Sequence, residues 1–251
     1  MLKEGQFIIR KDNIMNNFQK FLLGLLLIFS CVGNPLISHA FPIGNPTNQN
    51  PALKLNIGPM IDVYSQDFDA NGYKITGRGS RLLFNFNYGV DQNIGFFGNV
   101  GFSNEDLEIG GATNSGHYGL GIELGAKATL GEVKESHVKF GGGAKLALAQ
   151  SSVDFGPGSS TDVDWTEYGL FGGLSFEMEP EMIPYFGLQI TSATTKLKDS
   201  IGPGGQTDFD QDGLIGLFGG VDFKIQKDLT LGMELRILNE LSATLNLNFA
   251  L

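Results

Sequence analysis

Leu241-Ser-Ala-Thr-Leu-Asn-Leu-Asn-Phe-Ala-Leu251 ends the chain with an apolar residue at every odd position and with Ser, Thr, Asn or Ala at the even ones. Successive side chains of a β-strand point to opposite faces, so this stretch predicts a strand with one apolar and one polar face. A tilted strand needs roughly nine to eleven residues to cross a bilayer. The segment is long enough to do so.

The same alternation recurs along most of the sequence and predicts nine further strands. The ten expected strands cover residues 52–66, 73–90, 94–104, 115–131, 136–153, 163–178, 183–198, 213–226, 229–238 and 241–251. One face is apolar, as in Leu82, Phe84 and Phe86. The other carries charged and amide side chains, among them Asp62, Arg81, Glu123, Lys127, Lys145, Glu167, Asp222, Glu234 and Arg236.

Alternation by itself fits both a soluble β-sandwich and a membrane β-barrel, because only the direction of the apolar face differs. The connectors between the expected strands favour the barrel: their lengths are about six, three, ten, four, nine, four, fourteen, two and two residues. Short turns at one end and long loops at the other are typical of outer-membrane barrels. The hairpin at residues 239–240 is short on the long-loop side, and misreading it would reduce the count to eight strands.

The N-terminal region has the features of a secretory signal peptide. Basic residues up to Lys20 precede the apolar run Phe21–Phe29, and Ser38-His39-Ala40 offers a cleavage site, so we expect residues 1–40 to be removed. Translation could instead begin at Met15. The only cysteine, Cys31, would leave with the signal, unless it is the lipid attachment site of a lipoprotein. Residues 41–51 are rich in Pro, Asn and Gly and predict a linker into the barrel of residues 52–251.

The mature chain is strongly acidic. Residues 1–40 hold four of the 17 Lys and Arg and two of the 27 Asp and Glu, so 13 basic and 25 acidic side chains remain, a net charge of −12. This charge argues against nucleic acid as a partner and favours cations or basic ligands. Glycine, at 36 of 251 residues, is abundant, and in strands it marks places where a narrow interior must be kept clear.

These patterns resemble the small outer-membrane β-barrels of the OmpX, OmpW and opacity-protein type. The resemblance covers residues 52–251 and is carried by the alternating strands and by the C-terminal strand, although Leu251 stands where that family usually has Phe or Trp. It implies an all-β fold: a single closed, antiparallel, up-and-down transmembrane β-barrel in the outer membrane of a Gram-negative cell. Outer-membrane lipid and, during biogenesis, the barrel-assembly machinery are the implied partners.

Two segments repeat an Asp-x-Asp-x-Asx-Gly pattern, Asp67 to Gly72 and Asp208 to Gly213. Such spacing can place several oxygen ligands around one point, as at the start of a calcium-binding loop. The closing bidentate Glu is absent, which excludes an EF-hand, and Asp and Asn also cap ordinary turns. The candidate ligands of a weak calcium site are Asp67, Asp69, Asn71, Asp208, Asp210 and Asp212; no other cofactor is expected.

For catalysis, the mature chain offers His117 and His137, with Ser115 two residues from His117. Serine with a histidine base is the minimum for acyl transfer, but no third orienting group is evident from the sequence. We therefore predict a barrel that is not an enzyme. Its role is porin-like or surface interaction, with a narrow or side-chain-filled lumen through which ions or small solutes could pass, and with acidic loops at residues 104–114, 154–162 and 199–212. The alternative is a membrane-embedded hydrolase of the lipid A deacylase type that uses His117.

Overall fold

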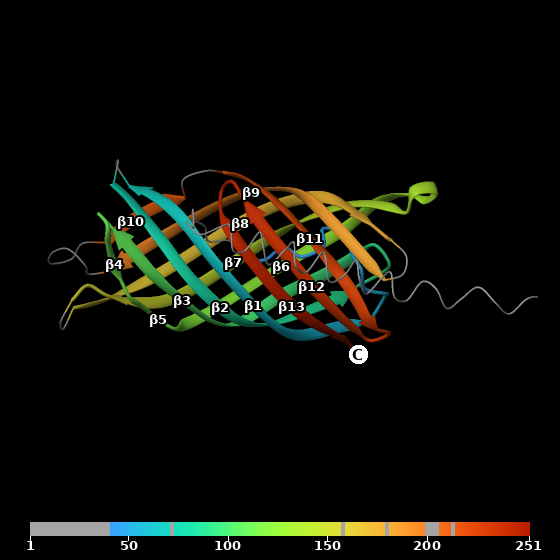
Figure 1. The fold of residues 1–251 in the computed structure, drawn as a ribbon, viewed down its shortest axis with the longest axis horizontal. Coiled ribbons are helices and arrows are strands. Elements are labelled where there is room, and N and C mark those ends of the chain that lie inside the picture. Colours follow the sequence, from blue (N-terminus) through green and yellow to red (C-terminus); the bar gives the residue numbers. More distant parts are fainter. Residues whose placement is uncertain (1–40, 71–72, 157–158, 179–180, 199–205, 212–213) are drawn as a thin grey trace, which may run out of the picture. The chain divides into compact units, whose positions relative to one another are not determined.

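The computed structural model describes residues 41–251 except 71–72, 157–158, 179–180, 199–205 and 212–213. Ten long strands wind diagonally around a barrel (Figure 1). They are β1 (Leu55–Ala70), β2 (Tyr73–Gly89), β3 (Ile94–Ile109), β6 (Gly119–Val133), β7 (Val138–Asp154), β8 (Ser160–Phe176), β9 (Met182–Lys198), β11 (Ile215–Gln226), β12 (Leu229–Ile237) and β13 (Leu241–Ala250). Three short strands, β4 (Ala112–Asn114), β5 (Gly116–His117) and β10 (Gln206–Gln211), lie in connections, and η1 (Lys134–Ser136) is a 3-10 turn.

The sheet is closed. Each long strand pairs antiparallel with its neighbours in the chain, and β13 returns to pair with β1 from Ser65↔Leu241 to Asn56↔Ala250. The predicted ten-stranded, up-and-down, antiparallel barrel is therefore confirmed. The eight-strand alternative is excluded, because β12 and β13 form a true hairpin that pairs Arg236 with Ser242. No helix in the described part of the chain has the length and apolar character needed to cross a membrane.

β1 and β3 extend further than predicted, and the predicted alternation of long loops and short turns does not hold throughout the barrel. β1 continues to Ala70 and β3 to Ile109, so much of the expected loop sequence is paired strand. The β7–β8 and β8–β9 connections have the same length, residues 155–159 and 177–181, although they lie at opposite ends of the barrel. The long connections are β3–β6, residues 110–118, and β9–β11, residues 199–214. In the first, β4 pairs with β3 and β5 pairs with β7; in the second, β10 pairs with both β9 and β1. The described strand residues of the predicted acidic loops, among them 104–109, 160–162 and 206–211, thus extend the barrel wall.

The apolar face points outward and the charged face points inward. Leu130, Phe102 and Leu170 are 72%, 59% and 61% exposed on the outer surface, whereas Arg236 and Glu123 are fully buried. A soluble sandwich would have the opposite arrangement, with leucines between two sheets and charges in water. That alternative is wrong for this chain.

The outer surface changes character along each strand. On β2 the outward side chains pass from Lys74 and Arg78 to Leu82 and Phe84, and β8 changes in the same way from Asp164 to Leu170. Inward positions change in the reverse sense at the same end of the barrel. Phe68, Ile75, Leu107, Val153, Val163, Leu197 and Phe209 all lie in one buried cluster there. One end of the barrel is therefore built like a soluble protein, with polar residues outside and apolar residues inside.

Candidate functional site

Residues 41–50 occupy the barrel lumen. Phe41 and Thr47 are completely buried, and Ile43, Asn45 and Asn50 are at most 6% exposed. We call residues 41–50 the lumenal segment. The sequence predicted a linker here, and the segment does lead into β1, but its side chains contact the inner wall of the barrel at several points. Because the lumenal segment occupies the barrel interior, it limits the space open to a solute.

Glu234 of β12 anchors the middle of the lumenal segment. Its two carboxylate oxygens accept hydrogen bonds from the backbone N–H groups of Ile43 and Gly44, at 3.0 and 2.8 Å. Tyr185 donates a third hydrogen bond to the same carboxylate at 3.2 Å. Gly44 has φ +68°, a left-handed conformation that glycine adopts without strain. One buried carboxylate thus satisfies two successive backbone donors, which would otherwise lack partners in the lumen.

Further hydrogen bonds hold the segment on both sides of Glu234. Lys127 donates to the carbonyl of Asn45 at 3.1 Å, and the hydroxyls of Thr47 and Ser175 lie 2.9 Å apart. Asn50 donates to the carbonyl of Asn87 on β2 at 2.7 Å. These contacts come from separate strands around the barrel, so the segment is bound to the wall as a whole.

Phe41 lies at the inner end of the lumenal segment, among aromatic and cationic side chains. Its ring stacks on Trp165 with centroids 5.3 Å apart, and the Arg81 guanidinium lies 4.1 Å from its centroid. Gly121 on β6 leaves the space that the ring uses, since a Cβ there would stand 3.3 Å from the edge of the ring. The abundance of glycine in the sequence predicted positions where a side chain would not fit in the interior, and Gly121 is one such position.

Ion pairs fill much of the remaining lumen. Asp62 bridges Arg81 and Arg236 at 3.1 and 2.6 Å, and Arg236 also lies 3.0 Å from Glu240. Lys145 lies 2.7 Å from Glu167, and Asn99 donates to Glu123 at 2.6 Å. A barrel of ten strands has an interior only a little wider than the side chains it holds. The inward charges that the sequence predicted are therefore mostly paired with one another across the lumen.

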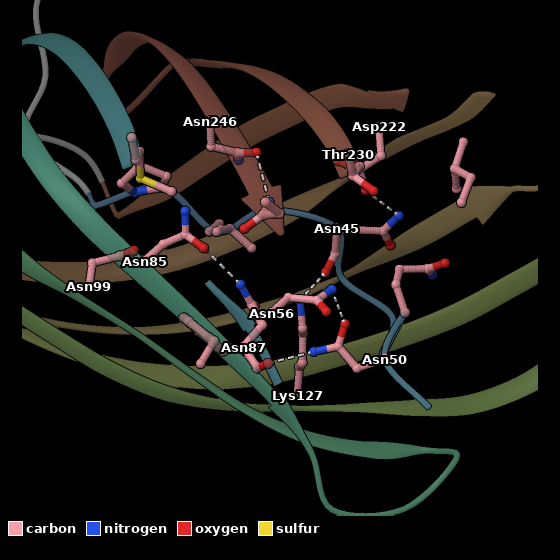
Figure 2. Close-up of a pocket in the computed structure, with 18 of the residues that line it drawn as sticks. Asn45, Asn50, Asn56, Asn85, Asn87, Asn99, Lys127, Asp222, Thr230 and Asn246 are labelled. Carbon is pink, nitrogen blue, oxygen red and sulfur yellow. Dashed lines mark hydrogen bonds between the residues drawn. The ribbon is translucent and has the colours of Figure 1, made fainter. Parts of the chain in front are cut away.

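One polar cavity of about 120 Å³ remains beside the lumenal segment (Figure 2). Its walls are rich in amides from the segment and from the facing strands, including Asn45, Asn50, Asn85, Asn99 and Asn246. Lys127 and Asp222 also face it. The space is large enough for a few water molecules. Toward the other end of the barrel, the inward side chains form the buried apolar cluster around Phe68 and Leu107.

The structure brings the two acidic repeats together on neighbouring strands. Asp69 of β1 is paired with Asp210 of β10, a proximity that the sequence did not predict. Asp67 accepts a hydrogen bond from Thr76 at 2.6 Å, and Asp210 accepts one from Thr194 at 3.1 Å.

The candidate ligands Asn71 and Asp212 lie outside the described residues. Among the residues that are described, no three His, Cys, Asp or Glu side chains are grouped closely enough to hold a metal ion. The calcium site stays a prediction.

His117 has an acidic partner that the sequence did not reveal. Its Nε2 lies 2.9 Å from Asp154 Oδ2 on the adjacent β7, where a carboxylate can only accept, so the ring nitrogen donates. This hydrogen bond is the main reason that the pKa of Asp154 is lowered. Both side chains are well exposed at the polar end of the barrel. His137 follows η1 at the opposite ends of these strands and takes no part.

No protein-family model matches the chain, and no curated protein matches it in sequence. Solved structures of outer-membrane β-barrels are similar to it. The translocator domain of the autotransporter NalP from Neisseria meningitidis gives a TM-score of 0.45 at 11% identity over 81% of this chain and 89% of that one. The outer membrane protein OprG from Pseudomonas aeruginosa gives a TM-score of 0.45 at 10% identity, over 80% of this chain and 97% of that one. The COG4313 outer membrane channel from Pseudomonas putida F1 gives a TM-score of 0.43 at 12% identity, over 85% of this chain and 100% of that one. With values this low, no property of these proteins is transferred to this chain.

Proposed function

We propose that this chain is an integral β-barrel of a bacterial outer membrane that serves surface interaction and does not conduct in its resting state. The observation that supports this proposal most directly is the filled lumen. Among the described residues, the lumenal segment, the buried ion pairs and the apolar cluster occupy most of the barrel interior, and the polar cavity beside the segment is small.

The membrane assignment depends on the outer surface. Large apolar side chains are exposed on every long strand, including Ile61, Phe84, Phe96, Leu124, Leu146, Leu170, Leu188, Leu217, Ile237 and Leu245. A soluble monomer rarely exposes an apolar patch of more than a few hundred Å². A band that surrounds the whole barrel needs lipid as its partner, and the assembly machinery would insert it there after export by the predicted signal.

The polar end of the barrel is the part that would meet the environment. Its strands project beyond the apolar band and remain paired up to their tips, as in the β1–β2 register from Gln66↔Gly77 to Ala70↔Tyr73. Outward charges on them form exposed ion pairs such as Arg78 with Glu108 at 3.0 Å. A paired, internally packed extension offers a defined surface for binding a partner, where the sequence predicted acidic loops.

Planar-bilayer recording of the purified full-length protein tests the resting state. Its folded form should first be verified by heat-modifiable gel mobility. We expect no steady conductance above that of the bilayer with detergent alone. A reproducible ohmic conductance of the folded protein would refute the closed lumen and support the porin-like alternative. Membrane fractionation tests the location, and recovery in the soluble periplasmic fraction would contradict it.

A second candidate function, a membrane-embedded hydrolase, has one specific observation in its favour. The His117–Asp154 pair is an oriented histidine of the kind that activates a nucleophile, and it lies at the exposed end of the barrel. Loss of a lipid-hydrolysing activity in His117→Ala, with activity retained in the control His137→Ala, would establish it. Absence of any hydrolysis by the unmodified protein would exclude it for the lipids tested.

A further inference from the structure

We infer that the mature chain begins at Phe41 and that its α-ammonium group is a cation of the barrel lumen, paired with Glu167. The predicted signal cleavage after Ala40 would create this amine. The structure adds a destination for it, because Phe41 lies inside the barrel and its carbonyl accepts a hydrogen bond from Lys145, the buried partner of Glu167.

The side chain of Phe41 is completely buried inside the barrel. It belongs to one buried cluster that continues through Met60, Leu83 and Trp165 to the apolar residues at the polar end of the barrel. Cleavage after Ala40 would therefore leave the new α-amine on a residue that is anchored in the interior.

The charge balance of the lumen calls for another cation. Among the described residues that are buried, six carboxylates face four basic groups: Asp62, Glu105, Glu123, Glu167, Glu234 and Glu240 against Arg81, Lys127, Lys145 and Arg236. An unpaired buried charge is costly, so a deficit of positive charge must be met by protonation or by a further cation. An α-ammonium group supplies one.

Lys145 links the backbone carbonyl of Phe41 to Glu167. The Lys145 ammonium donates to the carbonyl oxygen of Phe41 and lies 2.7 Å from a carboxylate oxygen of Glu167. Both side chains of that ion pair are fully buried. Neither oxygen of Glu167 receives a well-directed hydrogen bond, and one oxygen of Glu123 also lacks a donor. An ammonium group has three donors, which suits a site with acceptors left over.

Chemical labelling of the full-length protein, expressed with its own signal and purified from membranes, tests the location of the amine. N-terminal sequencing should give Phe-Pro-Ile-Gly-Asn. In the folded barrel, acetic anhydride near neutral pH should modify the α-amine at least about 100-fold more slowly than in urea, because a buried group reacts only through opening of the structure. The exposed Lys54 is the internal control and should be modified in both states. A different first residue, or an amine as reactive as Lys54, would overturn the inference.

Energetic coupling between two sequence changes tests whether Glu167 is the partner of the amine. Insertion of one glycine between Ala40 and Phe41 moves the charge while keeping the Phe41 ring, and Glu167→Gln removes the carboxylate. We expect the insertion to lower the urea midpoint in the parent protein and to lower it by no more than about half as much in the Glu167→Gln background. Asp222→Asn, beside Asn45 further along the segment, is the control background and should leave the effect of the insertion unchanged. Equal losses in all three backgrounds would exclude Glu167 as the counter-ion. If the insertion prevents folding, the rate of α-amine acetylation in folded Glu167→Gln is compared with that in folded Asp222→Asn, and equal rates would exclude Glu167 as the counter-ion.

Discussion

Replacing Glu234 with alanine should release the middle of the lumenal segment. The substitution leaves the N–H groups of Ile43 and Gly44 without acceptors in the lumen. Each unsatisfied buried donor costs about 1–3 kcal/mol. Arg236, which lies 3.5 Å from Glu234, keeps two other carboxylates, so its charge remains paired. The Tyr185 hydroxyl loses the same acceptor, so three unsatisfied donors at the middle of that range predict a decrease of about 6 kcal/mol in the free energy of unfolding.

Urea unfolding in detergent micelles, followed by tryptophan fluorescence and gel mobility, measures this change. Trp165 is the only tryptophan and stacks on Phe41, so its emission also reports whether the lumenal segment stays in place. We expect a red-shifted emission in Glu234→Ala before any global unfolding. Glu177→Ala is the control, because its partial exposure and its pairing with Lys139 predict a loss of no more than about 0.5 kcal/mol. Equal stability and identical emission of Glu234→Ala and the parent protein would refute the anchoring role of this carboxylate.

Three further substitutions test other parts of the structure. Leu170→Arg, on the apolar band, should cost about 2–4 kcal/mol in a bilayer, measured by urea unfolding in vesicles. Gly121→Leu should displace the Phe41 ring, seen as a changed Trp165 emission. His117→Ala should raise the pKa of the Asp154 carboxyl toward its ordinary value, measured by carboxyl NMR titration. Because the folded-state pKa is lowered, the pair stabilises the fold above the ordinary pKa of an aspartate, and this contribution is lost as the pH falls through the lowered value.

Each of these three substitutions has a matched control substitution elsewhere in the same chain. Thr194→Arg places the same charge on the outward face of β9 near the polar end, where a cost of about 0–1 kcal/mol is expected. Gly172 faces the outside, and the nearest atom would stand 3.6 Å from a Cβ at this position. Gly172→Leu should therefore leave the fluorescence emission of Trp165 unchanged. His137→Ala should not alter the pKa of Asp154. If a substitution and its control had similar effects, the position assigned to the substituted side chain would be wrong.

Local patterns were enough to predict the strands. The alternation in Leu241–Leu251 depends only on the two-residue period of an extended chain, and all ten long strands lie within a few residues of where that period placed them. The ends were predicted less well. Residues such as Asp67 and Asp69 suggested a turn, but their outward position on a paired strand suits charged side chains equally well.

The lumenal segment shows the limit of local information. Phe41–Asn50 has no strand or helix period, so its sequence resembles that of a linker. Its bonds go to Glu234, Lys127 and Ser175, which are far away in the sequence. The same holds for the partner of His117, since Asp154 becomes a neighbour only when β5 pairs with β7.

The sequence by itself determined that this chain forms two-faced strands, because alternation is a property of neighbouring residues; the pairing of β12 with β13 fixed their number at ten. Only the tertiary structure decided that the charged faces enclose a lumen, that β10 bridges β9 and β1, and that residues 41–50 fill the space inside. These features depend on closing the sheet, and closure joins residues such as Ser65 and Leu241 whose separation along the chain leaves no local trace.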